Sequence, residues 1–141
     1  MIPHDEPLRS LLRLRRMTVD EARRILATCL HRKAETEAAL AKIETAIEKE
    51  AATASALEAG DDAVEAFGAW LKRIRTCQHA AVEQDAEAEA RIQQARVVLV
   101  AAQAGLRAVE AAEARAIAEQ QAAKATQQQH ALEDTSRAYR S

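Results

Sequence analysis

The side chains that most often do chemistry in proteins are sparse and poorly spaced in this sequence. The four histidines lie at positions 4, 31, 79 and 130, and none has a histidine or cysteine four residues away. His79 and Glu83 would be helical neighbours, which is more typical of an exposed contact than of a metal site. The carboxylates between Glu83 and Glu89 have no evident pocket, so they predict a solvated acidic face.

Other reactive groups form no catalytic arrangement either. Cys29 and Cys77 do not have the spacing of a metal-binding pair, and no phosphate-binding loop of the GxxxxGK(S/T) or GxGxxG type occurs. No side chain pair in the sequence has the pattern of a nucleophile and its base. We therefore expect a protein that is not an enzyme and that needs no metal and no cofactor.

The one concentrated chemical feature is a run of arginines near the N-terminus. Residues 8–27 read LRSLLRLRRMTVDEARRILA. On a helical wheel the leucines, Val19 and Ile25 share one arc, and Arg15 falls within it. The other arginines share a second arc and are the candidate partner-binding residues: Arg9, Arg13, Arg16, Arg23 and Arg24. Because guanidinium groups pair bidentately with carboxylates, this arc suits an acidic protein surface.

The arginine arc has other interpretations. A membrane-surface amphipathic helix would use the same pattern, but the apolar stripe continues to residue 57 and is needed by a helical partner. Nucleic-acid binding is disfavoured because residues 34–71 hold nine acidic and two basic side chains, and no aromatic residues interleave with the arginines. The plainest interpretation is that these arginines have no partner and only keep one flank of a coiled coil exposed to water. Clustering where both chain ends meet favours a protein partner, with no nucleic acid and no membrane insertion.

The elements that must position this arc are expected to be long helices. Hydrophobic residues make up 48% of the chain but are mostly alanine, aromatics are 2%, and there are only 3 glycines and 2 prolines. Such a chain has few large side chains for a compact core and few breakers for turns. No apolar run is long enough to span a bilayer, and the N-terminus lacks a signal-peptide pattern. With a net charge of −2, we expect a soluble cytoplasmic all-α protein.

Local signals predict the boundaries of a single domain over residues 1–141. We expect a first helix over 8–58, a turn over 59–62, a second helix over 63–125 and a frayed or overhanging tail over 126–141. Gly60 is expected to end the first helix in the left-handed conformation. Asp62 and Glu65 predict a capping box for the second helix, and Thr18 with Glu21 predicts a helix start or restart.

Both predicted helices keep a seven-residue apolar repeat, which is typical of a left-handed coiled coil. The stripe runs from Leu12 to Leu57 in the first helix and from Phe67 to Ala123 in the second. A short turn makes the helices antiparallel neighbours, with facing residue numbers that sum to about 121. We predict a monomeric antiparallel two-helix coiled-coil hairpin. In this register Cys29 and Cys77 lie roughly 22 Å apart, too far for a disulfide.

Three segments resemble the FliJ/YscO family of stalk proteins from flagellar and injectisome type III secretion: LRSLLRLRR at 8–16, ARRILA at 22–27 and FGAWLKRIR at 67–75. The resemblance implies a helical hairpin similar to the coiled coil of a rotary ATPase γ subunit. It implies that the end bearing both termini binds the pore of the hexameric export ATPase and promotes its assembly and activity. Further implied partners are the export-gate membrane protein and export chaperones, at the cytoplasmic side of the inner membrane.

Carried onto this chain by region, the pore-facing candidates are Arg9, Arg13, Arg16, Arg23 and Arg24. The chain departs from the family in its alanine content, which predicts a thin coiled coil. A flagellar apparatus is favoured over an injectisome, though the sequence does not separate them. The main alternative is a coiled-coil adaptor that pairs with itself, and a third is a membrane-surface amphipathic protein.

Overall fold

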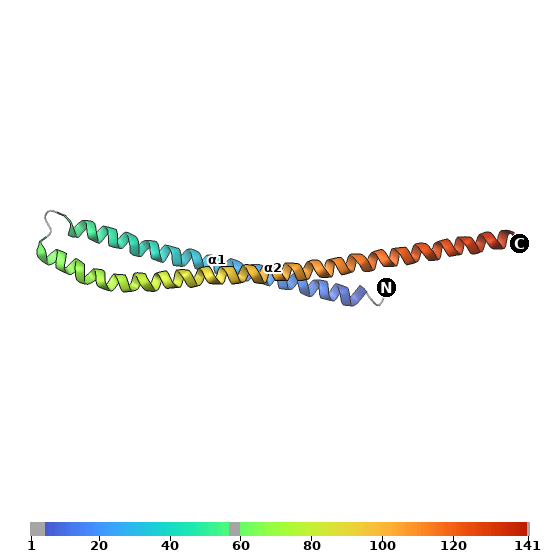
Figure 1. The fold of residues 1–141 in the computed structure, drawn as a ribbon, viewed down its shortest axis with the longest axis horizontal. Helices are drawn as coiled ribbons and strands as arrows, with labels where there is room; N and C mark the ends of the chain where they lie inside the picture. Colours follow the sequence, from blue (N-terminus) through green and yellow to red (C-terminus); the bar gives the residue numbers. More distant parts are fainter. Residues whose placement is uncertain (1–4, 57–59, 141) are drawn as a thin grey trace. The chain divides into compact units, whose positions relative to one another are not determined.

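The computed structural model describes residues 5–56 and 60–140, which form two α-helices (Figure 1). α1 spans Asp5–Ala54 and α2 spans Asp61–Arg140. The helices pack against each other in antiparallel register, and the described ranges contain no strand. The predicted all-α antiparallel two-helix hairpin is confirmed.

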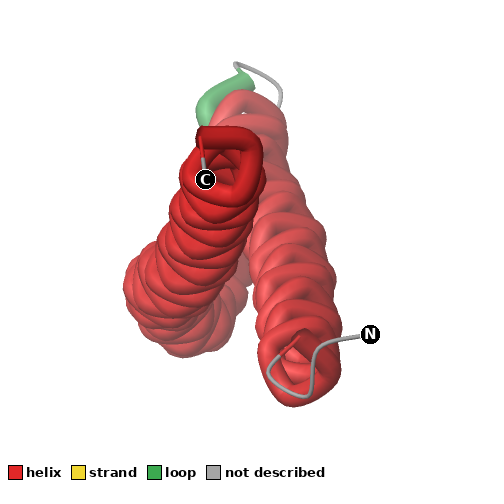
Figure 2. The backbone as a smooth tube through the Cα atoms, turned by 90° about the vertical axis from the view of Figure 1, so that its right-hand side faces the viewer, coloured by secondary structure: helices red, strands yellow, loops and turns green. Residues whose placement is uncertain are grey.

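The composition explains why both elements are helical over such lengths. Alanine, leucine, glutamate and arginine, which dominate the chain, are the strongest helix formers. The last proline, Pro7, lies in the first turn of α1, where its missing N–H would have no intrahelical partner anyway. Figure 2 shows helix along the described backbone except near the connection between α1 and α2.

At three of the four helix ends, the observed bound differs from the predicted one by a few residues. α1 begins at Asp5 and ends at Ala54, whereas 8–58 was predicted, and residues 57–58 lie outside the described part of the chain. The larger difference is the C-terminal tail, because α2 continues to Arg140. Threonine hydroxyls bond to carbonyls one turn earlier, from Thr126 to Ala122 and from Thr135 to Ala131. With no glycine or proline in residues 126–140, nothing in the sequence ends the helix.

Gly60 directly precedes α2 and does not end α1, which corrects the predicted turn. Its carbonyl oxygen accepts hydrogen bonds from the N–H groups of Ala63 and Val64, at 3.0 and 3.3 Å. No described glycine has a positive φ, so the left-handed conformation expected at Gly60 is wrong. Asp62 therefore lies inside the first turn of α2 and is not its cap. There its carboxylate interacts favourably with the positive end of the helix dipole.

The helix restart predicted at Thr18 and Glu21 is also wrong. α1 runs through this segment without a break. The Thr18 hydroxyl donates to the carbonyl of Leu14 at 3.0 Å, one turn earlier in the same helix. A threonine hydroxyl that donates to the carbonyl four residues earlier is typical of a helix interior and does not cap a new helix start.

Packing divides the chain into two compact units. The first comprises residues 1–21 and 100–141, and its buried apolar residues are Leu12, Val19, Ala102 and Val109. The second comprises residues 22–99, and its buried residues are Ala22, Thr36, Ala81, Ala88, Ile92 and Ala95. Five of these ten residues are alanines, each of which buries about one methyl group, so the apolar contribution of the fully buried residues is small.

The seven-residue stripes predict which residues are covered. In α2 every stripe position from Phe67 to Gln120 is buried or half-buried, and only Ala123 is exposed. In α1 the same holds apart from Arg15 and Glu50, which are exposed, and Leu57, which is outside the described residues. Contacts across the seam follow the predicted register, since Thr36 meets Asp85 in the second unit and Arg15 meets Gly105 in the first.

Candidate functional site

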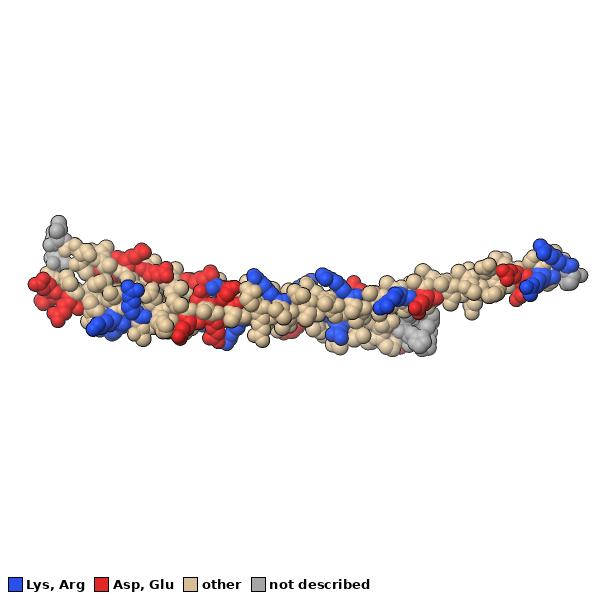
Figure 3. Space-filling view, viewed as in Figure 1, with Lys and Arg blue, Asp and Glu red and all other residues tan. Residues whose placement is uncertain are grey.

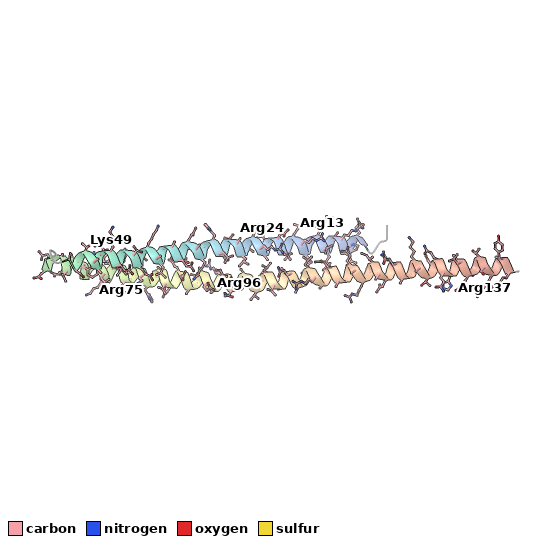
Figure 4. The ribbon with its side chains drawn as sticks, turned by 90° about the horizontal axis from the view of Figure 1, so that it is seen from above. Arg13, Arg24, Lys49, Arg75, Arg96 and Arg137 are labelled. Carbon is pink, nitrogen blue, oxygen red and sulfur yellow. The ribbon has the colours of Figure 1, made fainter. Side chains whose placement is uncertain are left out.

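Three of the five predicted partner-binding arginines lie in the first unit. Arg9, Arg13 and Arg16 follow one another on α1 at spacings of four and three residues, which places them on one helix face. All three are exposed. Arg13 projects from α1 on the side away from α2 (Figure 4). The result is a short row of guanidinium groups open to a partner.

Arg23 and Arg24 belong to the second unit. Both are exposed on α1, and each has an interaction partner in the structure. The predicted set of five therefore divides into an arginine row of Arg9, Arg13 and Arg16, and a separate pair. We keep the name "arginine row" for the three residues of the first unit.

Arg15 differs from the arginine row, as the helical wheel predicts. Its side chain crosses toward α2 and lies over Gly105, with Nη1 3.4 Å and Cζ 3.7 Å from the position that a β-carbon at residue 105 would take. A glycine inside a helix costs about 1 kcal/mol relative to alanine. A β-carbon at residue 105 would make only ordinary van der Waals contact with Arg15, so the position of the guanidinium group does not require glycine.

The arginine row is a local feature and not part of a strongly basic unit. Residues 1–21 contain four basic and four acidic side chains, and residues 100–141 contain five of each, so both parts of the unit are neutral overall. Figure 3 shows basic and acidic side chains intermingled on the visible face. At physiological ionic strength charges beyond about 8 Å are largely screened. Recognition by the arginine row would therefore depend on close contact and not on long-range attraction.

Aliphatic side chains on the flank of α1 opposite the arginine row remain partly exposed. Leu12 and Val19 are buried, but Leu11 is 37% exposed, Leu14 57% and Met17 59%. The wheel places both Leu11 and Leu14 in the apolar arc, but neither is a position of the seven-residue stripe. A two-helix coil covers only a narrow stripe, so leucines at its margin remain open to solvent. The first turns of α1 therefore carry a cationic flank, formed by the arginine row, and a separate apolar flank that includes these leucines.

A polar cluster interrupts the apolar seam of the second unit. Lys33 Nζ lies 2.9 Å from Asp85 Oδ2, and the Thr36 hydroxyl donates to Asp85 Oδ1 at 2.8 Å. Glu37 and Glu89 lie 3.6 and 3.7 Å from the same ammonium group. Thr36 is 3% exposed, and its hydroxyl has a second acceptor within reach, the carbonyl oxygen of Lys33 at 2.9 Å. The stripe positions predicted the location of these residues, but not their hydrogen bonds.

The cluster changes the acid–base behaviour of its two central groups. The hydrogen bond from Lys33, followed by that from Thr36, holds the pKa of the Asp85 carboxyl below its ordinary value. The hydrogen bond to Asp85, with the negative charges of Asp85, Glu37 and Glu89, raises the pKa of Lys33. Both groups are therefore charged at neutral pH and bind each other across the seam.

Among the grooves on the surface of the second unit, two are lined mainly by apolar side chains. The first has a volume of about 310 Å³ and is lined by Ala22, Ile25, Cys29, Arg91, Gln94, Ala95 and Val98. The second, of about 440 Å³, lies beside Phe67 and Trp70, whose rings stack with centroids 5.9 Å apart. Both aromatic residues are half-buried, and Glu50 and Arg73 also line this groove.

The histidines and cysteines form no site among residues 5–56 and 60–140. His31 pairs with Glu35 at 3.0 Å and His79 with Glu83 at 3.1 Å, each as exposed neighbours on one helix. No group of three metal-ligating side chains comes together in the described ranges. Both thiols are free, with Cys29 half-buried and Cys77 exposed.

Comparison with protein-family models, curated proteins and solved structures finds no match to this chain. Within the described ranges, neither helix has an apolar stretch long enough to cross a membrane.

Proposed function

We propose that this chain is a non-enzymatic stalk protein of a type III export apparatus, most consistent with a flagellar one. In this proposal the arginine row docks in the pore of the hexameric export ATPase and stimulates it. The observation that carries the proposal is the exposed row of Arg9, Arg13 and Arg16 on the first turns of α1, where α1 is packed on α2. The resemblance of segments 8–16, 22–27 and 67–75 to the FliJ/YscO family supports it.

The chemistry of the row suits carboxylates that line a pore. Each guanidinium group can bind one carboxylate through two parallel hydrogen bonds, which fixes geometry as well as charge. Exposed ion pairs are worth only about 0.2–1 kcal/mol each. A single hairpin inside a six-fold ring meets the subunits unequally, and so would couple nucleotide turnover to the export gate.

The remaining parts of the proposal concern the other partners. The export-gate membrane protein and export chaperones would bind surfaces outside the arginine row, with the protein at the cytoplasmic side of the inner membrane. Arg23 and Arg24 are retained as secondary contact residues. They are tested separately from the row because each already has a partner in the structure.

The test is ATP hydrolysis by the export ATPase of the same organism, titrated with this protein while the mass of the ATPase is followed. Wild-type protein is expected to raise the hydrolysis rate and to shift the ATPase toward a hexamer. The variant R9E/R13E/R16E should lose both effects because its side chains repel pore carboxylates. The matched control is K72E/R73E/R75E, which changes the net charge equally at three basic residues of the second unit.

Two outcomes would contradict the proposal. Wild-type protein that changes neither the hydrolysis rate nor the ATPase mass would exclude the stalk role. Equal loss of stimulation in both triple variants would show that total charge, and not the arginine row, is responsible. Circular dichroism of each variant establishes that the helices are intact.

A second candidate function is a self-associating coiled-coil adaptor. The observation in its favour is the number of aliphatic side chains that stay half exposed on the second unit, among them Ile25, Leu30, Val82 and Val98. In that case the export ATPase would not respond, and the chain would pair with itself.

A further inference from the structure

The seam of the second unit changes character along its length. We call residues 22–40 and 81–99 the inner segment, and residues 41–54 and 61–80 the tip segment. The inner segment holds every buried residue that the structure describes in this unit: Ala22, Thr36, Ala81, Ala88, Ile92 and Ala95. No residue of the tip segment is buried, although Ile47, Phe67 and Ile74 are among the largest side chains of the seam. The two segments therefore differ in how closely α1 and α2 pack.

The sizes of the facing side chains account for this difference. The register set by the contact of Thr36 with Asp85 pairs small with large side chains in the inner segment: Ala22 with Leu99, Leu26 with Ala95 and Cys29 with Ile92. In the tip segment the same register sets Ile47 against Ile74. The distance between packed helices depends on the side chains at the contact. Because two isoleucines meet there, α1 and α2 are held farther apart in the tip segment and cover each other less.

Hydrogen bonds between the two helices follow the same division. The polar cluster belongs to the inner segment, where Asp85 accepts hydrogen bonds from Lys33 at 2.9 Å and from Thr36 at 2.8 Å. Between residues 41–54 and residues 61–80 no hydrogen bond or ion pair joins α1 to α2. The groove of about 440 Å³ beside Phe67 and Trp70 is lined by residues of both helices there. Partly covered apolar contacts therefore hold the tip segment together.

We propose that the two helices of the tip segment separate while the inner segment stays closed, and that the polar cluster sets the boundary of this opening. Regions with few buried contacts open at a lower free energy than a packed core. Opening uncovers the apolar side chains of the tip segment. It stops at the inner segment because the hydrogen bonds of Asp85 must break before α1 and α2 can separate further. The proposal does not rest on binding of the export ATPase, since the arginine row belongs to the first unit.

The test is hydrogen–deuterium exchange of the full chain, followed by mass spectrometry of its peptic fragments. Unpacked helical stretches below about 15 residues are marginal in water, so amides of the tip segment exchange once its seam opens. They should exchange roughly tenfold or more faster than amides of the inner segment, after correction for the rates of an unfolded chain. Asp85→Ala should accelerate exchange in the inner segment roughly tenfold or more, because hydrogen bonds to a charged group are the stronger ones.

Glu83→Ala is the matched control, because Glu83 is an exposed carboxylate on the same helix that pairs with His79 of α2 and not with α1. It removes the same charge but no bond across the seam, so inner-segment exchange should stay within about twofold of the wild-type rate. Alanine favours helix more than aspartate does, so faster exchange in Asp85→Ala would not come from helix propensity. If Asp85→Ala fails to fold, Thr36→Val removes one of the two hydrogen bonds and should act in the same direction.

The single tryptophan gives a second readout from within the tip segment. Trp70 stacks on Phe67 with ring centroids 5.9 Å apart, so its fluorescence reports opening there. At the temperature where half of the fluorescence change has occurred, amides of the inner segment should still be protected from exchange.

Three results would overturn the proposal. Equal protection of the two segments in wild-type protein would show that the second unit opens as a whole. Loss of inner-segment protection at the midpoint of the Trp70 change would show the same. Equal effects of Asp85→Ala and Glu83→Ala on the inner segment would show that the polar cluster does not set the boundary.

Discussion

At the scale of residues, the polar cluster of the second unit is the feature with the sharpest consequences. Asp85 binds Lys33 and Thr36 across the seam, at 2.9 and 2.8 Å. In an apolar seam, polar residues at one level disfavour every register in which they would meet alkyl groups. In a parallel pairing Lys33 would face its own copy, which repels. The main effect of the cluster is therefore to disfavour other registers and parallel pairing, and its contribution to the free energy of unfolding is secondary.

The lowered pKa of Asp85 predicts how stability depends on pH. Its folded-state pKa lies below the ordinary value of 3.8. The stabilising contribution of the carboxylate is therefore complete above that value and is lost as the pH falls through the folded-state pKa. We expect Asp85→Asn to be less stable than wild type at neutral pH, with the difference shrinking at strongly acidic pH. Thermal unfolding followed by circular dichroism between neutral pH and about pH 2 measures this.

Glu44→Gln is the control for this prediction, because Glu44 is an exposed carboxylate on the same helix as Lys33. Its unfolding temperature should follow that of wild type closely at every pH. A difference between Asp85→Asn and wild type that stays constant down to the most acidic sample would show that the Asp85 charge contributes nothing.

At the scale of elements, the repeat of apolar residues predicts the helices and their seam, and local signals predict their ends poorly. The stripe from Phe67 to Gln120 is covered along its whole length. The failures concern residues whose signal is ambiguous. Gly60 and Thr18 are common both at helix ends and elsewhere, and the hydrogen bonds that decide between these roles involve backbone groups. Side-chain exposure at the seam margin, as at Leu14, depends on packing that sequence does not contain.

The C-terminal part of α2 is helical, but we expect it not to contribute to the stability of the seam. Residues 121–140 are helical, and all of them are exposed. Truncation after Gln120 should leave the unfolding temperature unchanged, because no seam contact is removed. The helical signal should fall in proportion to the residues lost. Circular dichroism of the truncated and full-length chains measures both quantities.

Truncation after Ala108 provides the comparison, since it also removes the buried Val109 and the half-buried residues up to Gln120. This shorter chain should unfold at a lower temperature. If removing only residues 121–141 lowers the unfolding temperature as much, the terminal segment must be packed on something in solution, and a second copy would be the first occupant to test.

At the scale of the whole molecule, the surfaces used by the two candidate functions differ in physical character. The arginine row consists of exposed cations, and its partner is expected to be acidic. A self-associating adaptor would use the exposed aliphatic side chains of the second unit, among them Ile25 and Val98. The net charge of −2 gives no strong repulsion between copies. The first function therefore depends on an electrostatic surface and the second on an apolar one.

Salt should therefore distinguish the two candidate functions. Raising the ionic strength from about 0.1 to about 0.5 M shortens the Debye length from about 10 Å to under half of that, which weakens exposed ion pairs. Stimulation of the export ATPase should therefore need more protein at high salt. The self-association of an adaptor should persist or strengthen, because apolar contacts do not depend on charge and excluded salts such as sulfate favour burial. Self-association that disappears at high salt would assign it to charged residues, and not to the exposed aliphatic side chains.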